Sequence, residues 1–235
     1  MTVTDYPGQE LEIFAAATVW KAYLARQLKR YLGRRVLEVG AGVGGTTRAL
    51  ATTCDAEWWC LEPDRKLAQA LGRALLDGEL AARCHLVIGT LRNIPSGERY
   101  DSLLYIDVLE HIEGDREELA NAALLLASSG HLVVVVPAHP WLFSAFDAAV
   151  GHHRRYVKRT LAALTPPGLR LVKLAYLDSA GLLASMGNHL LLRSAIPTPG
   201  QIAFWDKVLV RLSKVLDPCT GHRLGKSILA VWKRA

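Results

Sequence analysis

Residues Arg35–Leu50 read R-V-L-E-V-G-A-G-V-G-G-T-T-R-A-L, and this stretch decides the fold. Its first five residues are mostly apolar, which predicts a short buried strand over 35–39, and a helix is expected from Thr46 to about Thr52. The glycines between them form the tight exit from the strand. Their spacing fits two patterns, G-x-G-x-x-G from Gly40 to Gly45 and E-x-G-x-G-x-G from Glu38 to Gly44. The two patterns predict different ligands.

The rest of the chain alternates between expected helices and expected strands. A helix over 18–31 precedes the glycine stretch, and further helices are expected over 66–76 and 115–127. Asp115 and Glu118 have the spacing of a capping box at the start of the last of these helices. Strands are expected at 35–39, 57–61, 85–88, 102–106, 131–136, 169–176 and 227–232. This order predicts an α/β fold with a doubly wound sheet, whose ligands bind outside the carboxyl ends of the strands.

Length and element order predict one domain over residues 1–235. Its expected parts are an N-terminal helical cap over 1–33, a Rossmann-like core over 34–176, a helical insertion over 177–226 and a last strand over 227–235. The insertion contains apolar helical stretches at 181–192 and 201–216. Three roles stay open for it, namely covering a hydrophobic ligand, forming a homodimer face or touching a membrane surface.

Composition sets the broad class of the protein. Hydrophobic residues make up 51% and charged residues 21% of the chain, which indicates a globular protein. No apolar run reaches the ~20 residues of a membrane span, and the N-terminus lacks the pattern of a signal peptide, so a cytoplasmic protein is expected. The net charge of +6 permits acidic substrates or nucleic acid without requiring either. The four cysteines show no C-x-x-C spacing and are expected to be reduced core thiols, so no metal site is predicted.

Two acidic residues bear on the choice between the glycine patterns. Glu62 lies 22 residues after Gly40, at the end of the second expected strand, where a carboxylate can hold the two hydroxyls of a ribose. NAD and other adenosine ligands both need this contact. Glu38 separates them, because a carboxylate opposes a pyrophosphate but suits a ligand with a sulfonium and an α-ammonium group.

The glycine stretch, the helical prelude, the segment Asp107–His111 and the two strands after the fifth resemble the class I S-adenosylmethionine-dependent methyltransferases. The resemblance covers about Thr18 to Lys233, and the block G-H-H-R-R-Y at 151–156 is similar to a G-H-x-R-R-Y block in a group close to the type-11 and type-12 families. It implies a Rossmann-like sheet of seven strands in the order 3-2-1-4-5-7-6, with the last strand antiparallel. It also implies S-adenosylmethionine as cofactor, S-adenosylhomocysteine as product and a small-molecule methyl acceptor, with a role in secondary metabolism as one option.

The resemblance also assigns cofactor contacts by position. The methionine and ribose side would be lined by Glu38, Gly40, Ala41 and Gly42, with Thr47 near the carboxylate. Glu62 would bind the ribose hydroxyls, Pro63 would pack near the adenine, and Ile106 would close its other side. The family commonly has an acidic residue for the adenine amino group where this chain has Gly89-Thr90-Leu91. Thr90 is the expected substitute, through its hydroxyl or its backbone, and Leu91 is a further expected cofactor contact.

The acceptor side is less well defined by sequence. His111 is the first candidate for a general base, because its ordinary pKa of about 6.5 suits proton transfer, and Asp107 and Glu110 are its alternatives. A histidine that only caps or packs a helix is an equal alternative for His111.

Two further groups are candidates for the wall of the acceptor site. The first is His152, His153, Arg154 and Tyr156, which would form a wall or lid, or else belong to a basic helix start whose Arg154 and Arg155 pair with scaffold acids. The second is Tyr6, Trp20 and Tyr23 of the prelude, which would line the site or merely pack their helix onto the domain.

Three other functions remain as hypotheses. Nucleic-acid methylation fits the positive charge, but the chain has no N-P-P-Y-like motif after the fourth strand, no Pro-Cys nucleophile and no added RNA-binding module. An NAD-dependent oxidoreductase fits the first glycine pattern. A cofactor-binding protein without activity fits either pattern.

Overall fold

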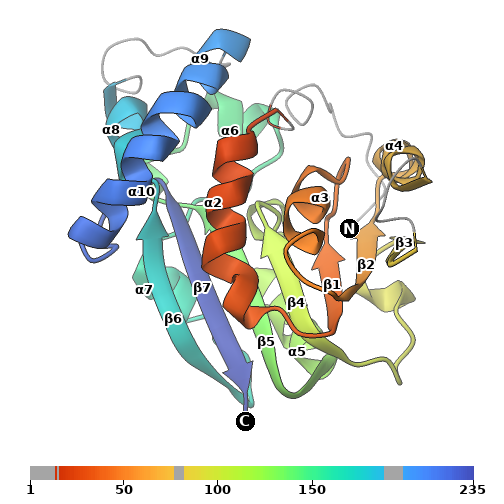
Figure 1. Ribbon diagram of the computed structural model, residues 1–235. Coiled ribbons are helices and arrows are strands. Elements are labelled where there is room, and N and C mark those ends of the chain that lie inside the picture. The colour runs from red at the N-terminus through yellow and green to blue at the C-terminus, as the bar shows by residue number, and fades with distance from the viewer. Residues whose placement is uncertain (1–13, 15, 77–81, 188–197) are drawn as a thin grey trace.

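The computed structural model describes residues 14, 16–76, 82–187 and 198–235. Its centre is a seven-stranded sheet in the order β3-β2-β1-β4-β5-β7-β6 (Figure 1). Strand β7 is antiparallel to β5 and to β6, whereas the other neighbouring strands run parallel. The strands are β1 (Arg35–Val39), β2 (Glu57–Glu62), β3 (Cys84–Ile88), β4 (Tyr100–Ile106), β5 (Leu126–Pro137), β6 (Leu169–Leu177) and β7 (Ser227–Arg234). The predicted fold class and strand order are therefore confirmed.

Helices cover both faces of this sheet (Figure 1). One face carries α2 (Thr18–Leu28), α3 (Gly45–Ala51), α4 (Arg65–Leu76), α8 (Ser179–Gly187), α9 (Pro199–Phe204) and α10 (Val210–Cys219), with the π-helical turn Trp205–Leu209 joining the last two. The other face carries α5 (Asp115–Leu124) and α7 (Lys158–Ala162). The short α6 (Ala145–Ala149) follows β5 near the carboxyl ends of the strands.

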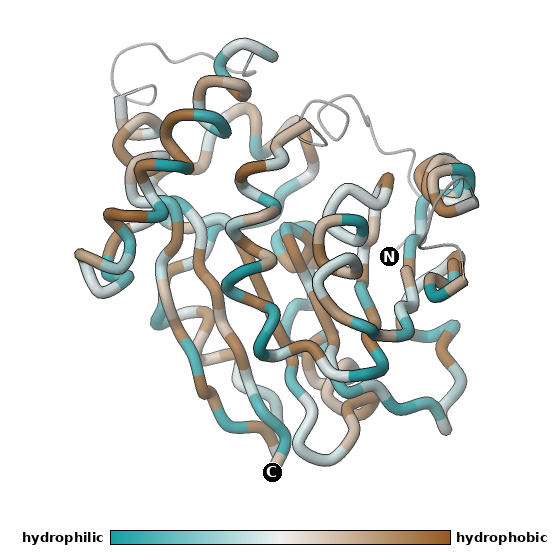
Figure 2. The backbone as a smooth tube through the Cα atoms, in the orientation of Figure 1, coloured by the Kyte–Doolittle hydropathy of each residue, from teal (hydrophilic) through white to brown (hydrophobic). Residues whose placement is uncertain are grey.

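Each strand supplies side chains to two separate cores. In β1, Val36 packs under the helices of the first face and Leu37 under those of the second, and both are fully buried. This alternation follows from the two-residue period of a strand, and a sheet covered on both faces needs apolar residues at every position. Figure 2 shows the consequence, with apolar colour along the central strands and mixed colour on the outer helices.

Helix α5 begins at Asp115 as predicted, but its end and its capping differ from the prediction. The helix ends at Leu124 instead of reaching Ala127, because Leu126 already pairs with Tyr100 as the first residue of β5. The expected capping box does not form either, since α5 has no side-chain cap. Asp115 accepts a hydrogen bond from the Tyr156 hydroxyl at 2.9 Å, and Glu118 accepts one from the Tyr105 hydroxyl at 2.9 Å. The two carboxylates thus bind tyrosine hydroxyls from other elements instead of the backbone amides at the start of α5.

The N-terminal cap and the insertion form one layer. The carboxylate of Asp206 accepts hydrogen bonds from the amides of Val19 (3.1 Å) and Trp20 (2.7 Å) in the first turn of α2. A second buried carboxylate, Asp217, accepts the Tyr23 hydroxyl at 2.7 Å and the amide of Ser179 at 2.9 Å. Two segments far apart in sequence are therefore joined over the carboxyl ends of the strands, where the sheet would bind a ligand.

Among the described helices, none combines the length and the apolar character that a bilayer span requires. The four cysteines are free thiols.

Candidate active site

The turn after β1 is built from glycines because its backbone conformation demands them. Gly40, Gly42 and Gly44 have φ angles of 70°, 57° and 79°, in the left-handed region that other residues rarely adopt. A Cβ atom on Gly40 would lie 2.6 Å from a methyl carbon of Val108. The amide of Gly40 donates to the carbonyl of Leu61 at 2.8 Å, which ties the turn to the end of β2. The turn is thus held between the ends of β2 and β4.

Glu62, the last residue of β2, is fixed by two backbone amides. One carboxylate oxygen accepts the amide of Gly42 at 2.7 Å and the other accepts the amide of Asp64 at 2.9 Å. Burial raises the pKa of Glu62, and these two hydrogen bonds act in the opposite direction. The side chain is 4% exposed and its remaining acceptor capacity faces a cavity. A buried carboxylate of this kind suits a ligand with two adjacent hydroxyls.

The cavity in front of Glu62 has a volume of about 940 Å³, and we call it the larger cavity. In the loop after β3, the amide of Thr90 donates to the side-chain oxygen of Asn93 at 2.9 Å, and this hydrogen bond fixes the conformation of the loop. Its lining includes most of the residues predicted for the nucleoside side, namely Gly40, Gly42, Glu62, Pro63, Thr90 and Leu91.

A second cavity of about 290 Å³, the smaller cavity, lies on the other side of the glycine turn. Its apolar wall comes from both the cap and the insertion, and two lysines, Lys21 and Lys226, approach it from the same two segments. Burial lowers the pKa of both lysines. The lining includes Phe14, Trp20, Leu24, Phe146, Val150 and Trp205 as apolar residues, and Asp107, Glu110, His111, His152 and Arg155 as polar ones.

The two cavities meet at Gly40, Gly42, Asp107 and His111, which line both. Burial raises the pKa of Asp107 to about 6, although His152 and Lys226 lower it in part. Burial and then the nearby His152 lower the pKa of His111 to about 4. At neutral pH His111 is therefore uncharged, and Asp107 is the group whose pKa lies closer to 7.

Glu38 and Thr47 lie beside the glycine turn but line neither cavity. The Thr47 hydroxyl and the Trp58 indole both donate to one oxygen of Glu38, at 2.7 and 2.8 Å. Burial raises the pKa of Glu38 to about 7 against these two hydrogen bonds. Glu38 is thus part of the support for the turn. Ile106 also differs from the expectation, since it lines the smaller cavity together with Ala41 and not the larger one.

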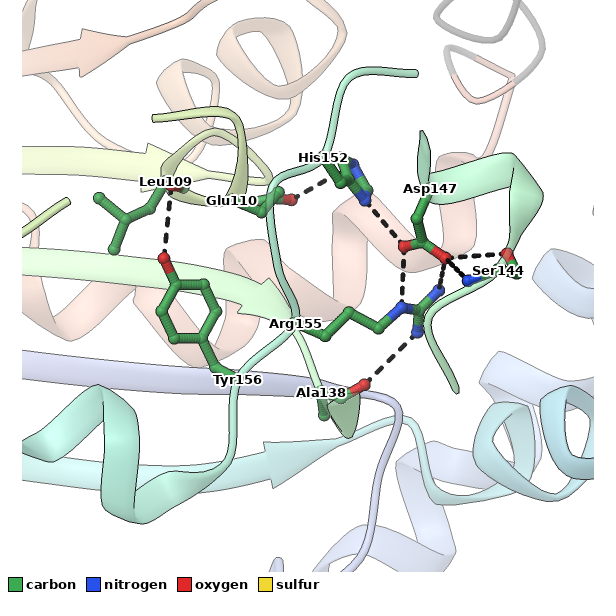
Figure 3. Close-up of polar contacts among 8 residues, drawn as sticks. All are labelled: Leu109, Glu110, Ala138, Ser144, Asp147, His152, Arg155 and Tyr156. Atoms are coloured by element: carbon green, nitrogen blue, oxygen red, sulfur yellow. Dashed lines mark hydrogen bonds and ion pairs between the residues drawn. The ribbon is translucent and has the colours of Figure 1, made fainter. Parts of the chain in front are cut away.

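Of the residues predicted for the acceptor wall from the block at 151–156, His152 lines the smaller cavity. Its Nδ1 lies 2.8 Å from the carboxylate of Asp147, and Arg155 donates to the same carboxylate at 2.8 and 3.0 Å (Figure 3). Burial alone would raise the pKa of Asp147, but the hydrogen bonds from His152 and Arg155 outweigh it and hold the pKa well below its ordinary value. The block begins at Gly151, whose φ of 82° again requires glycine.

Four residues predicted for the acceptor wall do not reach it. His153 is exposed, and its amide donates to the Glu110 carbonyl. Arg154 pairs with Asp115 at 2.8 Å, as expected of a scaffold arginine. The Tyr156 ring is 2% exposed within the second core. Tyr23 turns toward Asp217, so its role is to pack the cap, whereas its neighbour Trp20 does line the smaller cavity. Tyr6 lies outside the described residues.

Several residues of the site were not found by sequence reasoning. Lys226 could have been, because it immediately precedes β7, and the start of an antiparallel strand lies at the edge where its neighbours end. Asp147 and Trp205 gave no such signal. Their positions depend on how α6 and the insertion fold over the sheet.

Known proteins that resemble this chain in sequence or in fold include methyltransferases. Residues 37–132 match the family model described as a methyltransferase domain. Demethylmenaquinone methyltransferase of Tropheryma whipplei is 30% identical over 146 residues, which are 62% of this chain and 58% of that protein. The chain therefore matches little more than half the length of this curated relative.

Two solved structures illustrate the likeness in fold. A putative sarcosine dimethylglycine methyltransferase from Galdieria sulphuraria superimposes with a TM-score of 0.61 at 16% identity, covering 93% of this chain and 85% of its own. The phosphoethanolamine N-methyltransferase 2 of Haemonchus contortus, solved with S-adenosylhomocysteine, gives 0.61 at 15% identity, covering 96% of this chain and 57% of its own.

In its strand order, its glycine turn and its match to a methyltransferase domain over residues 37–132, this chain resembles the class I S-adenosylmethionine-dependent methyltransferases. S-adenosylmethionine is the methyl donor of this class.

Proposed function

We propose that this protein transfers a methyl group from S-adenosylmethionine to a small hydrophobic or aromatic acceptor and leaves S-adenosylhomocysteine. The observation that carries the proposal is the junction of the two cavities at Gly40, Gly42, Asp107 and His111. A nucleoside in the larger cavity and an acceptor in the smaller one would bring sulfonium and nucleophile together there. Such a displacement depends mainly on orientation, which can contribute up to roughly 7–11 kcal/mol.

The donor would be held by residues at the ends of β2 and β3 and on α2. Glu62 would accept the two ribose hydroxyls, while Pro63 and Leu91 would pack against the adenine and Thr90 would meet its polar edge. Lys21, which lines the smaller cavity beside the glycine turn and whose ammonium donates to the Phe14 carbonyl at 2.7 Å, would bind the α-carboxylate where the donor reaches that cavity. Glu38 and Thr47 would act indirectly, by keeping that turn in shape.

The acceptor would occupy the smaller cavity. Trp20, Phe146 and Trp205 offer apolar surface for a ring, and His152 borders the same space. Lys226, whose ammonium lies 4.0 Å from the centre of the Trp205 ring, suits an acceptor that carries an acidic substituent.

An acceptor that must lose a proton would give it to Asp107 in preference to His111. A base is most effective when its pKa lies near the working pH. The raised pKa of Asp107, about 6, meets this condition better than the lowered pKa of His111, about 4.

Titration calorimetry with S-adenosylhomocysteine and with NADH tests the donor. We expect binding of the sulfur nucleotide alone, and tight NADH binding without it would favour the oxidoreductase hypothesis. Incubation of cell extracts with methyl-labelled donor tests the acceptor. Label in a small-molecule fraction supports the proposal, label in RNA or DNA favours the nucleic-acid hypothesis, and donor binding without any product favours a binding protein.

A further inference from the structure

Glu110 lies at the wall of the smaller cavity with no adequate partner. Its side chain is fully buried, and neither carboxylate oxygen has a hydrogen-bond partner among the described residues. A buried carboxylate is normally paired with a cation or a set of hydrogen-bond donors, because leaving it unpaired is costly. The proposed methyl transfer gives Glu110 no role, so its position calls for a different ligand.

Two imidazoles lie next to this carboxylate. The rings of His111 and His152 are 4.6 Å apart between centroids and stand at 78° to one another. His152 Nε2 lies 3.9 Å from Glu110 Oε1, which is too far for a hydrogen bond. One nitrogen or oxygen atom from each of Glu110, His111 and His152 lies within 4.8 Å of the other two.

These separations suit three ligands around one ion. Nitrogen and carboxylate ligands lie at about 2.0–2.2 Å from zinc, so two tetrahedral ligands are roughly 3.4 Å apart. A shift of about 1 Å in the side chains would bring the three groups to that spacing. Figure 3 shows Glu110 and His152 directed toward each other across this gap.

The surroundings orient His152 as they would a metal ligand. Asp147 accepts a hydrogen bond from Nδ1 at 2.8 Å, so Nδ1 carries the hydrogen and the lone pair of Nε2 faces Glu110. Asp147 is itself fixed by Arg155 at 2.8 Å and by the Ser144 hydroxyl at 2.9 Å. A carboxylate behind a ligating histidine is the usual outer support of a metal site.

His111 has a similar support on its own side. Its ring hydrogen-bonds to the backbone of Gly151, the residue directly before His152. The G-H-H-R-R-Y block thus orients both imidazoles at once, one through a backbone group and one through Asp147.

We propose that Glu110, His111 and His152 bind one divalent transition-metal ion, of the zinc type, at the wall of the smaller cavity, where His111 also borders the larger one. Two imidazoles and one carboxylate are ligands that such ions prefer. The sequence did not predict a metal, because Glu110 and His152 lie 42 positions apart and show no ligand spacing.

The role of the ion in catalysis rests on the proposed function. All three ligands line the smaller cavity, so the open coordination positions would face the acceptor. An ion there would bind an acceptor hydroxyl and lower its pKa, with Asp107 as the nearby base that takes the proton. The oxygen would then form a bond to the methyl carbon as the carbon–sulfur bond breaks, and the electron pair would remain on sulfur as a neutral thioether.

Metal binding can be measured without donor or acceptor. The full chain is stripped with a chelator, and Zn²⁺ is then titrated by calorimetry, with Co²⁺ used in parallel for its visible absorption. We expect one ion per chain with a Kd below about 1 μM and a Co²⁺ spectrum of a site with nitrogen ligands. Absence of stoichiometric binding by the wild-type chain overturns the proposal.

Single substitutions assign the ligands. His152→Ala and Glu110→Gln should each weaken Zn²⁺ binding by at least about 100-fold, and Asp147→Asn should weaken it by about 10- to 100-fold. His153→Ala is the matched control, because His153 is the adjacent histidine and lines neither cavity. Equal Zn²⁺ affinity in His152→Ala and His153→Ala would overturn the assignment, even where stoichiometric binding occurs.

Glu110→Gln guards against loss of folding, since it removes a buried charge without changing the shape of the side chain. Its thermal unfolding and its binding of S-adenosylhomocysteine should match those of the wild type stripped of metal. Binding of Zn²⁺ without binding of the sulfur nucleotide would refute the proposed function alone. The reverse result would refute the metal site alone.

Discussion

Glu62 combines a structural contact with a proposed ligand contact. Its oxygens hold the amides of Gly42 and Asp64, and the same carboxylate faces the larger cavity. We expect Glu62→Ala to weaken binding of S-adenosylhomocysteine by about 10- to 100-fold, because a hydrogen bond to a charged group contributes roughly 1.5–3 kcal/mol. Titration calorimetry measures the change.

Glu57→Gln is the control, since Glu57 is an exposed acid of the same strand that pairs with His85. Equal affinity in the two variants would remove Glu62 from the donor site.

Glu38 makes stability depend on pH. Burial raises its folded-state pKa to about 7 from an ordinary value of 4.5. The folded protein therefore holds this proton more tightly than the unfolded chain, so the associated stability is fully present below pH 4.5 and is lost as pH rises through about 7. In Glu38→Gln, an amide oxygen can still accept from Thr47 and Trp58 without titrating.

We expect the free energy of unfolding of the wild type to fall by about 2 kcal/mol more than that of Glu38→Gln between pH 5 and pH 8. Urea denaturation at intervals of one pH unit gives both curves. Parallel curves for the two proteins would mean that Glu38 titrates in the folded state as it does in water.

The strands of the sheet could be predicted from the sequence, but the packing of α6 and of the insertion over the sheet could not. The buried run Val133–Val136 and the glycine turn carry their signals locally, because a strand between two helical layers is apolar throughout and a left-handed turn needs glycine. The end of α5 was misplaced because Leu126 pairs with Tyr100 in another strand. Of the candidate site, Glu62 and His152 were found through strand ends and motifs. Trp205 and Asp147 depend on contacts over long sequence separations, which no local pattern records.

The start of α2 is capped by a residue of the insertion. Ala17, the residue before the helix, offers no side-chain cap, and Asp206 accepts the amides of Val19 and Trp20 instead. We expect Asp206→Ala to lower the free energy of unfolding by about 1–3 kcal/mol, because two helix-end amides lose a charged acceptor. Asp206→Asn should recover part of this loss. Urea denaturation compares them with Asp55→Ala, which removes an exposed aspartate. Equal stability of Asp206→Ala and Asp55→Ala would refute the cap.

The side of the insertion that faces the sheet and the side that faces solvent differ in their contacts. Its inner side contributes Trp205 and Lys226 to the smaller cavity. Its outer side exposes four apolar residues at helical spacing, namely Phe204 (57%), Val208 (49%), Leu212 (48%) and Val215 (62%). An apolar stripe of this kind loses its contact with water when two copies pack together. The homodimer through the insertion therefore stays our prediction, with the cavity cover as a second role of the same helices.

Substituting this stripe should separate assembly from folding. We expect Leu212→Glu combined with Val215→Glu to convert a dimer into a monomer, because two carboxylates per copy would have to be buried unpaired at the interface. Analytical ultracentrifugation over a range of concentrations measures the change.

Leu124→Glu is the matched control, since Leu124 is an equally exposed leucine (64%) on α5, across the sheet from the insertion, and should leave the dimer intact. A wild-type chain that sediments as a monomer at every concentration would refute the dimer. The stripe would then be available to a different partner, and the cover of the smaller cavity would not change.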